Sequence, residues 1–333
     1  MSYTNGLDNP ELYFQCKLYT GDGSTPSITL DGDTDMQPDF VWIKNRDATD
    51  SHCLFDAVRG VTEVLHPDAT TAETTDADTL TSFDSDGFAL GDDDKVNTNT
   101  EKYVAWCWKE SATSGFDIVG FTGNETNRTV SHSLSAVPHY MVVRTRNGDA
   151  GRNYSVYHHK NTSAPETDHI FWDSTQATED DATIWQDTAP TSSLFSIGTN
   201  LGVNEDTKNI IAYLWTEKQG YSKFSSFLGN GNVDGAFIYT GFKPAFLMVK
   251  ATSTTSAWYI YDNKRAGYNV ENYQLYPNLN NAEDTTDQID LLSNGFKWRA
   301  ITGDPNSSGR TYIYMAFAEA PFVNSNGVPC NAR

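Results

Sequence analysis

The stretch Pro38-Asp39-Phe40-Val41-Trp42-Ile43-Lys44 decides the fold, because two similar stretches recur further along the chain. They are Pro138-His139-Tyr140-Met141-Val142-Val143-Arg144 and Pro244-Ala245-Phe246-Leu247-Met248-Val249-Lys250. In each, a proline leads an apolar run rich in β-branched and aromatic residues, which is typical of a β-strand. A run without polar interruptions indicates a central strand that is covered on both faces. Its recurrence predicts a repeat architecture.

Other landmarks surround these three strands in a constant order. An aromatic residue and a glycine open each unit, at 19–23, 121–124 and 227–231. An aromatic–polar pair follows each proline-led strand, as Phe55-Asp56, Tyr157-His158 and Tyr261-Asp262. A phenylalanine comes next, as Phe88, Phe195 and Phe296. An apolar strand ending in glutamate closes each unit, at 103–110, 210–217 and 312–319. Landmarks that keep both order and spacing indicate one unit present three times.

The sequence therefore predicts an all-β fold of three tandem homologous antiparallel β-sandwich-like units, each of about 100 residues. The expected parts are an N-terminal docking arm at 1–17, repeat units at 18–110, 117–218 and 225–320, and a C-terminal tail at 321–333. Strands are favoured over helices because the apolar runs are short and lack a 3.6-residue period. The best helix candidate, 56–65, is interrupted by Gly60. The short linkers at 111–115 and 219–223 predict units that pack against one another.

The aromatic residues of the repeat strands are expected in the core. We expect core packing rather than stacking platforms for sugars, because most of them fall on inward-looking strands. The tryptophans concerned are Trp42, Trp106, Trp108, Trp215 and Trp258. Trp108, Trp215 and Phe317 each lie two residues before the closing glutamate, so we expect them at equivalent buried positions.

Units one and three share a pair of opposite charges. Asp56 and Arg59 have the same spacing as Asp262 and Arg265, which predicts a local salt bridge in both units. We favour a structural clamp over a ligand-binding role for these pairs. Unit two has Tyr157-His158-His159-Lys160 at this place and departs from the pattern.

Charge and hydropathy exclude some partners. Acidic residues number 44 against 23 basic ones, a formal net charge of −21 at pH 7. This charge repels phosphate backbones and anionic lipids, so we expect no nucleic-acid partner and interpret the excess as a source of solubility. No apolar run approaches the roughly 20 residues needed to cross a bilayer, and the N-terminus does not resemble a signal peptide. We therefore expect no membrane span and synthesis in a cytosol.

The sequence contains no recognisable catalytic motif. GxSxG and HExxH patterns are missing, and no GKS/T follows the glycine-rich turns that could otherwise hold a phosphate. Candidate carboxylate pairs are too abundant among 44 acidic residues to indicate a glycosidase. We expect a protein that is not an enzyme, name no catalytic, cofactor-binding or metal-ligating residue, expect no cofactor, and leave the binding residues unknown.

Metal binding has few supporting signals. The loop Asp31-Gly32-Asp33-Thr34-Asp35 begins like a calcium loop, but Met36 at the sixth position and Trp42 at the twelfth exclude an EF-hand. Loose calcium binding there or at Asp92-Asp93-Asp94 stays open. We expect turn or surface positions rather than metal sites for His132, His139, His158 and His159. The cysteines lack a zinc-site spacing and are Cys16, Cys53, Cys107 and Cys330, of which Cys107 is expected in the core.

Several longer runs carry a family resemblance. They are Phe40-Val41-Trp42-Ile43-Lys44-Asn45-Arg46, Leu54-Phe55-Asp56-Ala57-Val58-Arg59-Gly60, Leu80-Thr81-Ser82-Phe83-Asp84-Ser85-Asp86-Gly87-Phe88, Tyr103-Val104-Ala105-Trp106-Cys107-Trp108-Lys109, Gly220-Tyr221-Ser222-Lys223-Phe224 and Tyr312-Ile313-Tyr314-Met315-Ala316-Phe317-Ala318-Glu319. The chain resembles repeated-domain virion structural proteins of tailed phages that infect marine bacteria such as cyanobacteria. The resemblance covers essentially the whole chain and implies a fibre-like or appendage-like protein without established catalytic residues.

This resemblance sets the functional expectations. We expect a phage virion structural protein on the particle exterior, a tail fibre, appendage or adhesin for host-surface attachment, synthesised in the host bacterial cytoplasm. The expected partners are other virion proteins, further copies of the chain with a trimer favoured, and a host surface glycan. The segments 1–17 and 321–333 are expected to be attachment elements outside the units. Alternatives that stay open are a head or tail decoration protein, a carbohydrate-binding module and a polysaccharide depolymerase.

Overall fold

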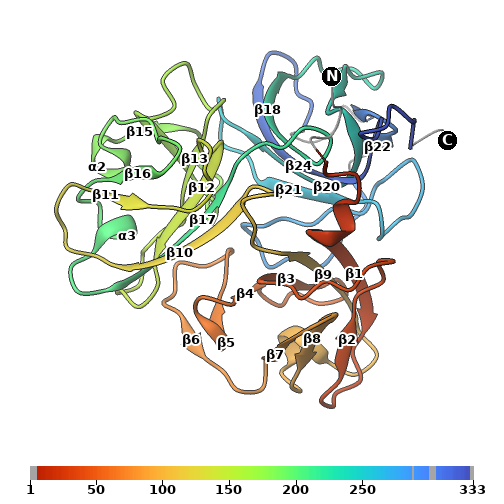
Figure 1. Cartoon of the computed structure of the whole chain (residues 1–333), viewed down its shortest axis with the longest axis horizontal. Helices are drawn as coiled ribbons and strands as arrows, with labels where there is room; N and C mark the ends of the chain where they lie inside the picture. The colour runs from red at the N-terminus through yellow and green to blue at the C-terminus, as the bar shows by residue number, and fades with distance from the viewer. Residues whose placement is uncertain (1–5, 287–288, 300–304, 331–333) are drawn as a thin grey trace.

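The strands are arranged as three similar groups around a common centre (Figure 1). The computed structural model describes residues 6–286, 289–299 and 305–330. The helices in these ranges are the 3-10 helix η1 (Pro10–Leu12) and the short α-helices α1 (Asp94–Asn97), α2 (Ala182–Trp185) and α3 (Leu201–Asn204). The protein is therefore an all-β protein with several antiparallel sheets, as the sequence predicts.

Unit one has a main sheet and a smaller second sheet. The main sheet has the order β1 (Phe14–Thr20), β9 (Lys102–Trp108), β3 (Phe40–Asn45), β4 (Cys53–Asp56), β5 (Gly60–Leu65) and β6 (Thr74–Thr75). The small sheet has the order β2 (Ser27–Thr29), β8 (Gly87–Leu90) and β7 (Leu80–Asp84). The best helix candidate of the sequence, 56–65, is not helical, as expected, because that segment forms the end of β4, a turn and β5.

Units two and three have corresponding sheets. The main sheet of unit two has the order β10 (Phe116–Thr122), β17 (Asn209–Trp215), β12 (Tyr140–Thr145), β13 (Ser155–His158), β14 (Asp168–Phe171) and β15 (Glu179–Asp180), and its small sheet pairs β11 (Arg128–Ser131) with β16 (Leu194–Ile197). The main sheet of unit three has the order β18 (Ser222–Leu228), β24 (Thr311–Pro321), β20 (Phe242–Ala251) and β21 (Trp258–Asp262), and its small sheet has the order β19 (Phe237–Tyr239), β23 (Gly295–Trp298) and β22 (Ile289–Leu292).

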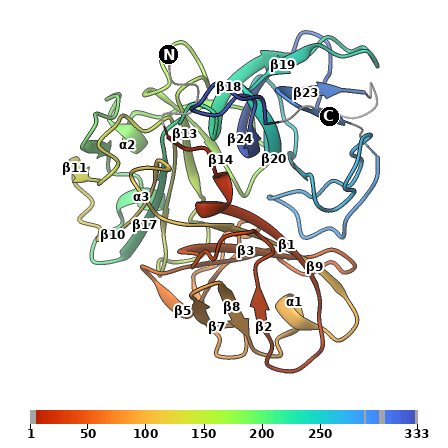
Figure 2. The same cartoon turned by 45° about the vertical axis from the view of Figure 1, so that its right-hand side comes forward.

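The first four strands of each main sheet occupy the same positions. Each opening strand pairs with the closing strand, which pairs with the proline-led strand, which pairs with its hairpin partner. The proline-led strands β3, β12 and β20 thus have corresponding neighbours on both sides, although a bulge interrupts β20 near Pro244. Figure 2 shows the three groups from a second direction.

The proline-led strands are buried on both faces because their side chains alternate between two cores. In β3, Phe40 and Trp42 lie in a core shared by all three units, whereas Val41 and Ile43 lie between the two sheets of unit one. Units two and three have the same alternation and their own inner cores. This arrangement explains the uninterrupted apolar runs. One face of each main sheet packs on the small sheet of its own unit, and the other face packs on the neighbouring units.

Large aromatic side chains fill the shared core. Trp108, Trp215 and Phe317 are each 1% exposed, and they pair across strands with Phe40, Tyr140 and Phe246, respectively. The ring centroids of Trp108 and Phe317 lie 5.5 Å apart, so units one and three are in direct contact at the centre. The predicted equivalent burial of these three residues is confirmed.

One backbone hydrogen bond recurs at every contact between units. The amide of Glu73 donates to the carbonyl of Arg146 at 2.8 Å, that of Thr178 to Thr252 at 2.9 Å, and that of Glu283 to Arg46 at 2.9 Å. These bonds connect unit one to two, two to three, and three back to one. The three groups therefore form a closed ring.

The end segments differ from the expected arm and tail. Strand β1 begins at Phe14 and pairs with β9, so residues 14–17 belong to unit one rather than to a docking arm. Phe14 is 2% exposed in the shared core, because the hydrophobic ring gains most by burial there. At the other end, the amide of Ser325 donates to Asp8 at 2.8 Å. The two end segments thus contact each other rather than extending separately.

Candidate functional site

Charged side chains gather at the contacts between units, which we call joint one (units one and two), joint two (units two and three) and joint three (units three and one). At joint one, Asp56 and Arg59 form a buried ion pair. Arg59 also donates to Glu73 at 2.9 Å, and Glu73 pairs with Arg146 of unit two at 2.7 Å. The hydroxyl of Tyr213, also from unit two, donates to Asp56 at 2.7 Å.

Joint three has the same network of charges. Asp262 and Arg265 pair at 2.6 Å, and Arg265 reaches Glu283 at 3.0 Å. Glu283 in turn pairs with Arg46 of unit one at 2.7 Å. The indole nitrogen of Trp106 donates to Asp262 at 3.0 Å, where joint one has Tyr213. The two local salt bridges predicted from the sequence are confirmed, and each extends into the neighbouring unit.

Both arginines keep their charge in a fully buried environment. Burial alone disfavours the charged form, but Asp56 raises the pKa of Arg59 and Asp262 raises the pKa of Arg265. Burial also acts to raise the pKa of Glu73, yet Arg146 and Arg59 bring that pKa below its usual value. The Asp56–Arg59 and Asp262–Arg265 pairs have no solvent-exposed atoms that a ligand could reach. This supports a structural role for both pairs over a ligand-binding role.

Joint two replaces the clamp with a neutral histidine. The Nε2 atom of His158 lies 3.1 Å from the carbonyl oxygen of Tyr314 in unit three. Burial, with the neighbouring His159 adding to it, lowers the pKa of His158 to about 3. The ring is therefore neutral and donates one hydrogen bond across the joint. The expectation of a surface position is wrong for His158, because the ring fills this contact.

Two more histidines lie beside it. The rings of His139 and His159 have centroids 4.4 Å apart, and the Nε2 atom of His159 lies 2.7 Å from the carbonyl of Phe224 in unit three. Burial lowers the pKa of His159 to about 4. His132 lies apart, half-buried in the loop after β11, where its Nε2 atom is 3.1 Å from the carbonyl oxygen of Thr191. The three clustered histidines therefore serve as uncharged packing and hydrogen-bonding groups.

The closing glutamates lie at the three joints in different surroundings. Glu110 accepts from the amide of Ile118 at 3.3 Å, and its pKa is raised to about 7 by burial and by its hydrogen bond with Asp117. Glu217 pairs with Lys223 at 2.6 Å. Glu319 pairs with Lys243 at 2.5 Å. The same landmark thus lies buried beside a second carboxyl group at joint one and is ion-paired at joints two and three.

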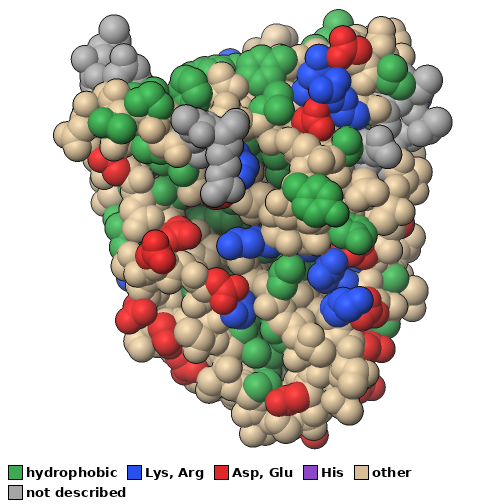
Figure 3. Space-filling view, turned by 90° about the vertical axis from the view of Figure 1, so that its right-hand side faces the viewer, with side chains coloured by type: hydrophobic (Ala, Val, Ile, Leu, Met, Phe, Trp, Pro, Cys, Tyr) green, Lys and Arg blue, Asp and Glu red, His purple; other side chains and the backbone are tan. Residues whose placement is uncertain are grey.

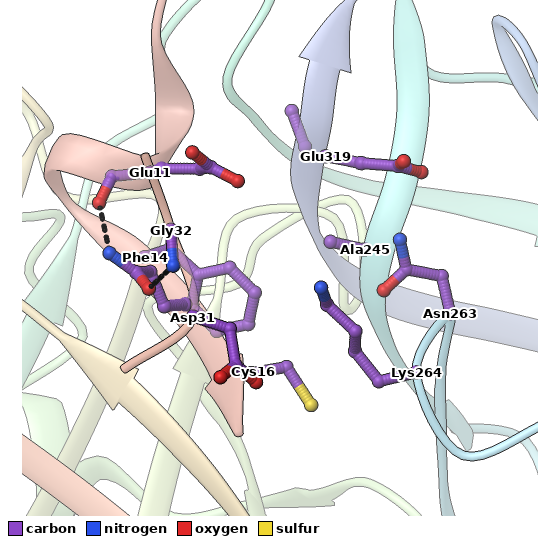
Figure 4. A pocket seen from close by; sticks show the side chains of 11 residues that line it. Glu11, Phe14, Cys16, Asp31, Gly32, Ala245, Asn263, Lys264 and Glu319 are labelled. Carbon is purple, nitrogen blue, oxygen red and sulfur yellow. Dashed lines mark hydrogen bonds between the residues drawn. The ribbon is translucent and has the colours of Figure 1, made fainter. Parts of the chain in front are cut away.

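A small pocket of about 70 Å³ opens at joint three (Figure 4). Glu11 and Glu319 face each other across it, and Lys264 extends into it between Glu319 and Cys16. The side chain of Gln15 narrows the pocket, since it donates to the carbonyl of Glu11 at 3.0 Å and accepts from the amide of Gly32 at 2.8 Å. Only a small polar group fits this space.

The chemistry of this pocket does not indicate a reactive centre. Burial, together with the charge of Asp262, raises the pKa of the Cys16 thiol well above its usual value, so the sulfur is not a thiolate. The pocket adjoins a larger hollow of about 870 Å³ that shares Glu11 and Glu319 and includes the highly exposed Tyr268. Figure 3 shows this side of the molecule, where charged groups of both signs lie across the middle.

The described residues contain no group of three or more His, Cys, Asp or Glu side chains that could hold a metal ion. Of the two acidic loops, Asp31 pairs with Lys17 at 2.5 Å, and Asp93 caps α1 by accepting from the amide of Lys95 at 2.8 Å. Cys107 is buried as expected, and all four cysteines are free. No helix in the described ranges is both long enough and apolar enough to cross a membrane.

Three buried asparagines escaped the sequence reasoning. Asn97, Asn204 and Asn306 are at most 5% exposed, and each lies 13 residues before its closing glutamate. Each side-chain oxygen accepts from the opening-turn amide of its unit, at 2.9, 3.1 and 3.2 Å. Their constant spacing was a signal that could have found them.

Comparison with known protein families identifies one family. A family model described as a domain of unknown function (DUF7483) matches residues 9–321. No curated protein matches the chain. The matched range includes all three units, from the start of β1 to the end of β24.

Proposed function

The chain belongs to the family described as a domain of unknown function (DUF7483), and from that premise we propose that it is a surface-binding structural protein on the exterior of a tailed-phage particle. The resemblance of its repeat runs to phage virion proteins supports the placement on a particle. In this proposal the protein is made in the host bacterial cytoplasm and incorporated into the virion, where it acts by binding rather than by catalysis.

The observation that carries the binding function is an aromatic edge strand found in unit three alone. Phe237 and Tyr239 of β19 are 46% and 60% exposed. The corresponding outward positions hold Ser27 and Thr29 in unit one, and Thr129 and Ser131 in unit two. Large exposed aromatic residues are typical of interaction surfaces.

Further apolar residues of unit three and of the segment that follows it are exposed. They are Leu228, Val233, Val270 and Val328, with exposed fractions from 40% to 62%. Units one and two keep the shared architecture but expose fewer such residues. This difference supports a division of labour in which unit three makes contact with a partner and the ring of joints holds it rigidly.

Analysis of purified particles tests this proposal. We expect mass spectrometry to find the chain in stoichiometric amounts, and antibodies against unit three to label the outside of intact particles. Labelling at the tail would support host attachment, and labelling at the head would support the decoration role. A chain that is present in infected cells but missing from purified particles would contradict the proposal.

The non-enzymatic part of the proposal has its own test. Purified protein is incubated with host envelope polysaccharide, and newly formed reducing ends are measured. We expect none above the level of a heat-denatured control. Reducing ends that appear with the parent chain and disappear after one carboxylate substitution would establish a depolymerase instead.

A further inference from the structure

At two of the three joints a hydrogen bond connects the opening strand of a unit to the loop after its edge strand, and joint two differs. In joint one, Asp117 accepts from the hydroxyl of Ser133 at 2.9 Å, which ties the second residue of the opening strand to the loop after the edge strand. In joint three, Gln15 accepts from the amide of Gly32 at 2.8 Å in the same way. At joint three, the bonded Gln15 and Gly32 line the small pocket of Figure 4.

Joint two lacks this tie. The corresponding residue is Lys223, which pairs with Glu217 at 2.6 Å instead of reaching the loop after β19. A cavity of about 450 Å³ remains between the linker to unit three, the loop after β19 and the segment after β24. We call this cavity the Tyr239 hollow, after the aromatic residue on its rim. Its volume is within the range of small-molecule sites, roughly 300 to 1,000 Å³.

The aromatic ring of Tyr239 is held in place by its backbone. Gly241 has a φ of +88°, and a side chain there would begin 3.5 Å from the Tyr239 hydroxyl, so the ring lies close to this glycine. The amides of Thr240 and Gly241 both donate to the carbonyl of Asn294, at 3.0 and 3.2 Å. The turn that carries Tyr239 is therefore fixed at its backbone, the exposed ring lies against Gly241, and Phe322 adds a second aromatic residue to the lining.

Polar groups complete the hollow. The side chains of Glu217 and Lys223 are 26% and 32% exposed, so their ion pair faces the cavity with capacity for further hydrogen bonds. The carboxylate offers acceptors and the ammonium offers donors, and the exposed amide of Gln219 offers both. A ligand whose hydroxyl groups both donate and accept hydrogen bonds can bind to these donors and acceptors together.

We propose that the Tyr239 hollow binds a saccharide, with the apolar face of a sugar ring against Tyr239 and its hydroxyls on Glu217, Lys223 and Gln219. A sugar combines one apolar face with many hydroxyls, and this combination matches an aromatic platform beside a donor–acceptor pair. The inference rests on the proposed function, of which it names the ligand class and the site.

The test is binding of the purified full chain to an array of immobilised neutral and acidic oligosaccharides. We expect binding to at least one of them, and a loss of about tenfold in affinity for Tyr239→Ala, because a stacking contact is removed. Glu217→Gln should also weaken binding. Tyr268→Ala is the matched control, since it removes an exposed tyrosine of the same unit outside the hollow.

The outcomes separate the inference from the proposed function. Binding that Tyr239→Ala weakens and Tyr268→Ala leaves unchanged supports the site. Lack of binding by the parent chain, or equal binding by parent and Tyr239→Ala, overturns it. Circular dichroism of each variant shows whether it is folded, and Tyr239→Phe, which keeps the ring, should retain binding. Detection of the chain on particles is independent of all these results.

Discussion

The buried ion pairs of Arg59 and Arg265 belong to the contacts between units as much as to their own units. Each arginine neutralises an aspartate three residues earlier and a glutamate that reaches the next unit. The sequence predicted the local half of this arrangement, because its spacing repeats. The distant half could not be predicted, since nothing local connects Glu73 to Arg146 or Glu283 to Arg46.

Arg59→Met should strongly destabilise the protein. The substitution leaves Asp56 and Glu73 buried without their cation, and breaking a buried pair in this way costs about 3–5 kcal/mol in the free energy of unfolding. Lys95→Met is the control, because its ion pair with Asp93 is at the surface and is worth about 0–1 kcal/mol. Urea denaturation measures both. Similar small losses for the two variants would contradict the clamp.

Glu110 should make the stability of joint one depend on pH. Its pKa is 4.5 when unperturbed and about 7 in the folded chain, so the folded state holds a proton that the unfolded state releases. The resulting stabilisation is present below pH 4.5 and is lost as the pH rises through about 7.

The variant Glu110→Gln should not show this loss. We expect the melting temperature of the variant minus that of the parent to be larger at pH 8 than at pH 4.5, because only the parent loses stabilisation as the pH rises. Thermal unfolding monitored by circular dichroism at both values measures the difference, and Glu125→Gln, at an exposed position, is the control. A parent–variant difference that is the same at both pH values would show that Glu110 is not protonated in the folded protein.

At the scale of the elements, the sequence predicts the main strands and opening turns, but it does not predict which unit the first strand joins. The glycine of each opening turn has a steric reason: a side chain on Gly21, Gly123 or Gly229 would lie 2.2, 2.1 or 2.3 Å from a backbone oxygen. Such local constraints leave a signal in the sequence. The start of β1 leaves no such local signal. Its assignment to unit one depends on pairing with β9, which is far away in the chain.

Truncation of the closing strands should reveal the shared core. We expect Trp108→Ala, Trp215→Ala and Phe317→Ala each to lower the free energy of unfolding by about 3–5 kcal/mol, because each leaves a cavity among buried rings. Val58→Ala, at a position 44% exposed, should have little effect. Chemical denaturation measures all four. A neutral result at all three aromatic positions would contradict their burial.

At the scale of the whole molecule, the tandem triplication of one ancestral unit and the homo-oligomer both remain predictions. We expect the chain, which has a net charge of −21, to form a symmetric oligomer, a trimer in particular, when salt screens its surface. Light scattering at high protein concentration in seawater-like salt measures the mass, and a monomeric mass would contradict this prediction.

The central claim is that three units form one closed body around a shared core. Units that share a core cannot unfold separately, so the full chain should behave as one cooperative unit. Differential scanning calorimetry measures this directly. The account predicts a single transition whose calorimetric enthalpy equals its van't Hoff enthalpy. Two or three resolved transitions, or a calorimetric enthalpy about three times the van't Hoff value, as expected for independently folding domains, would contradict it.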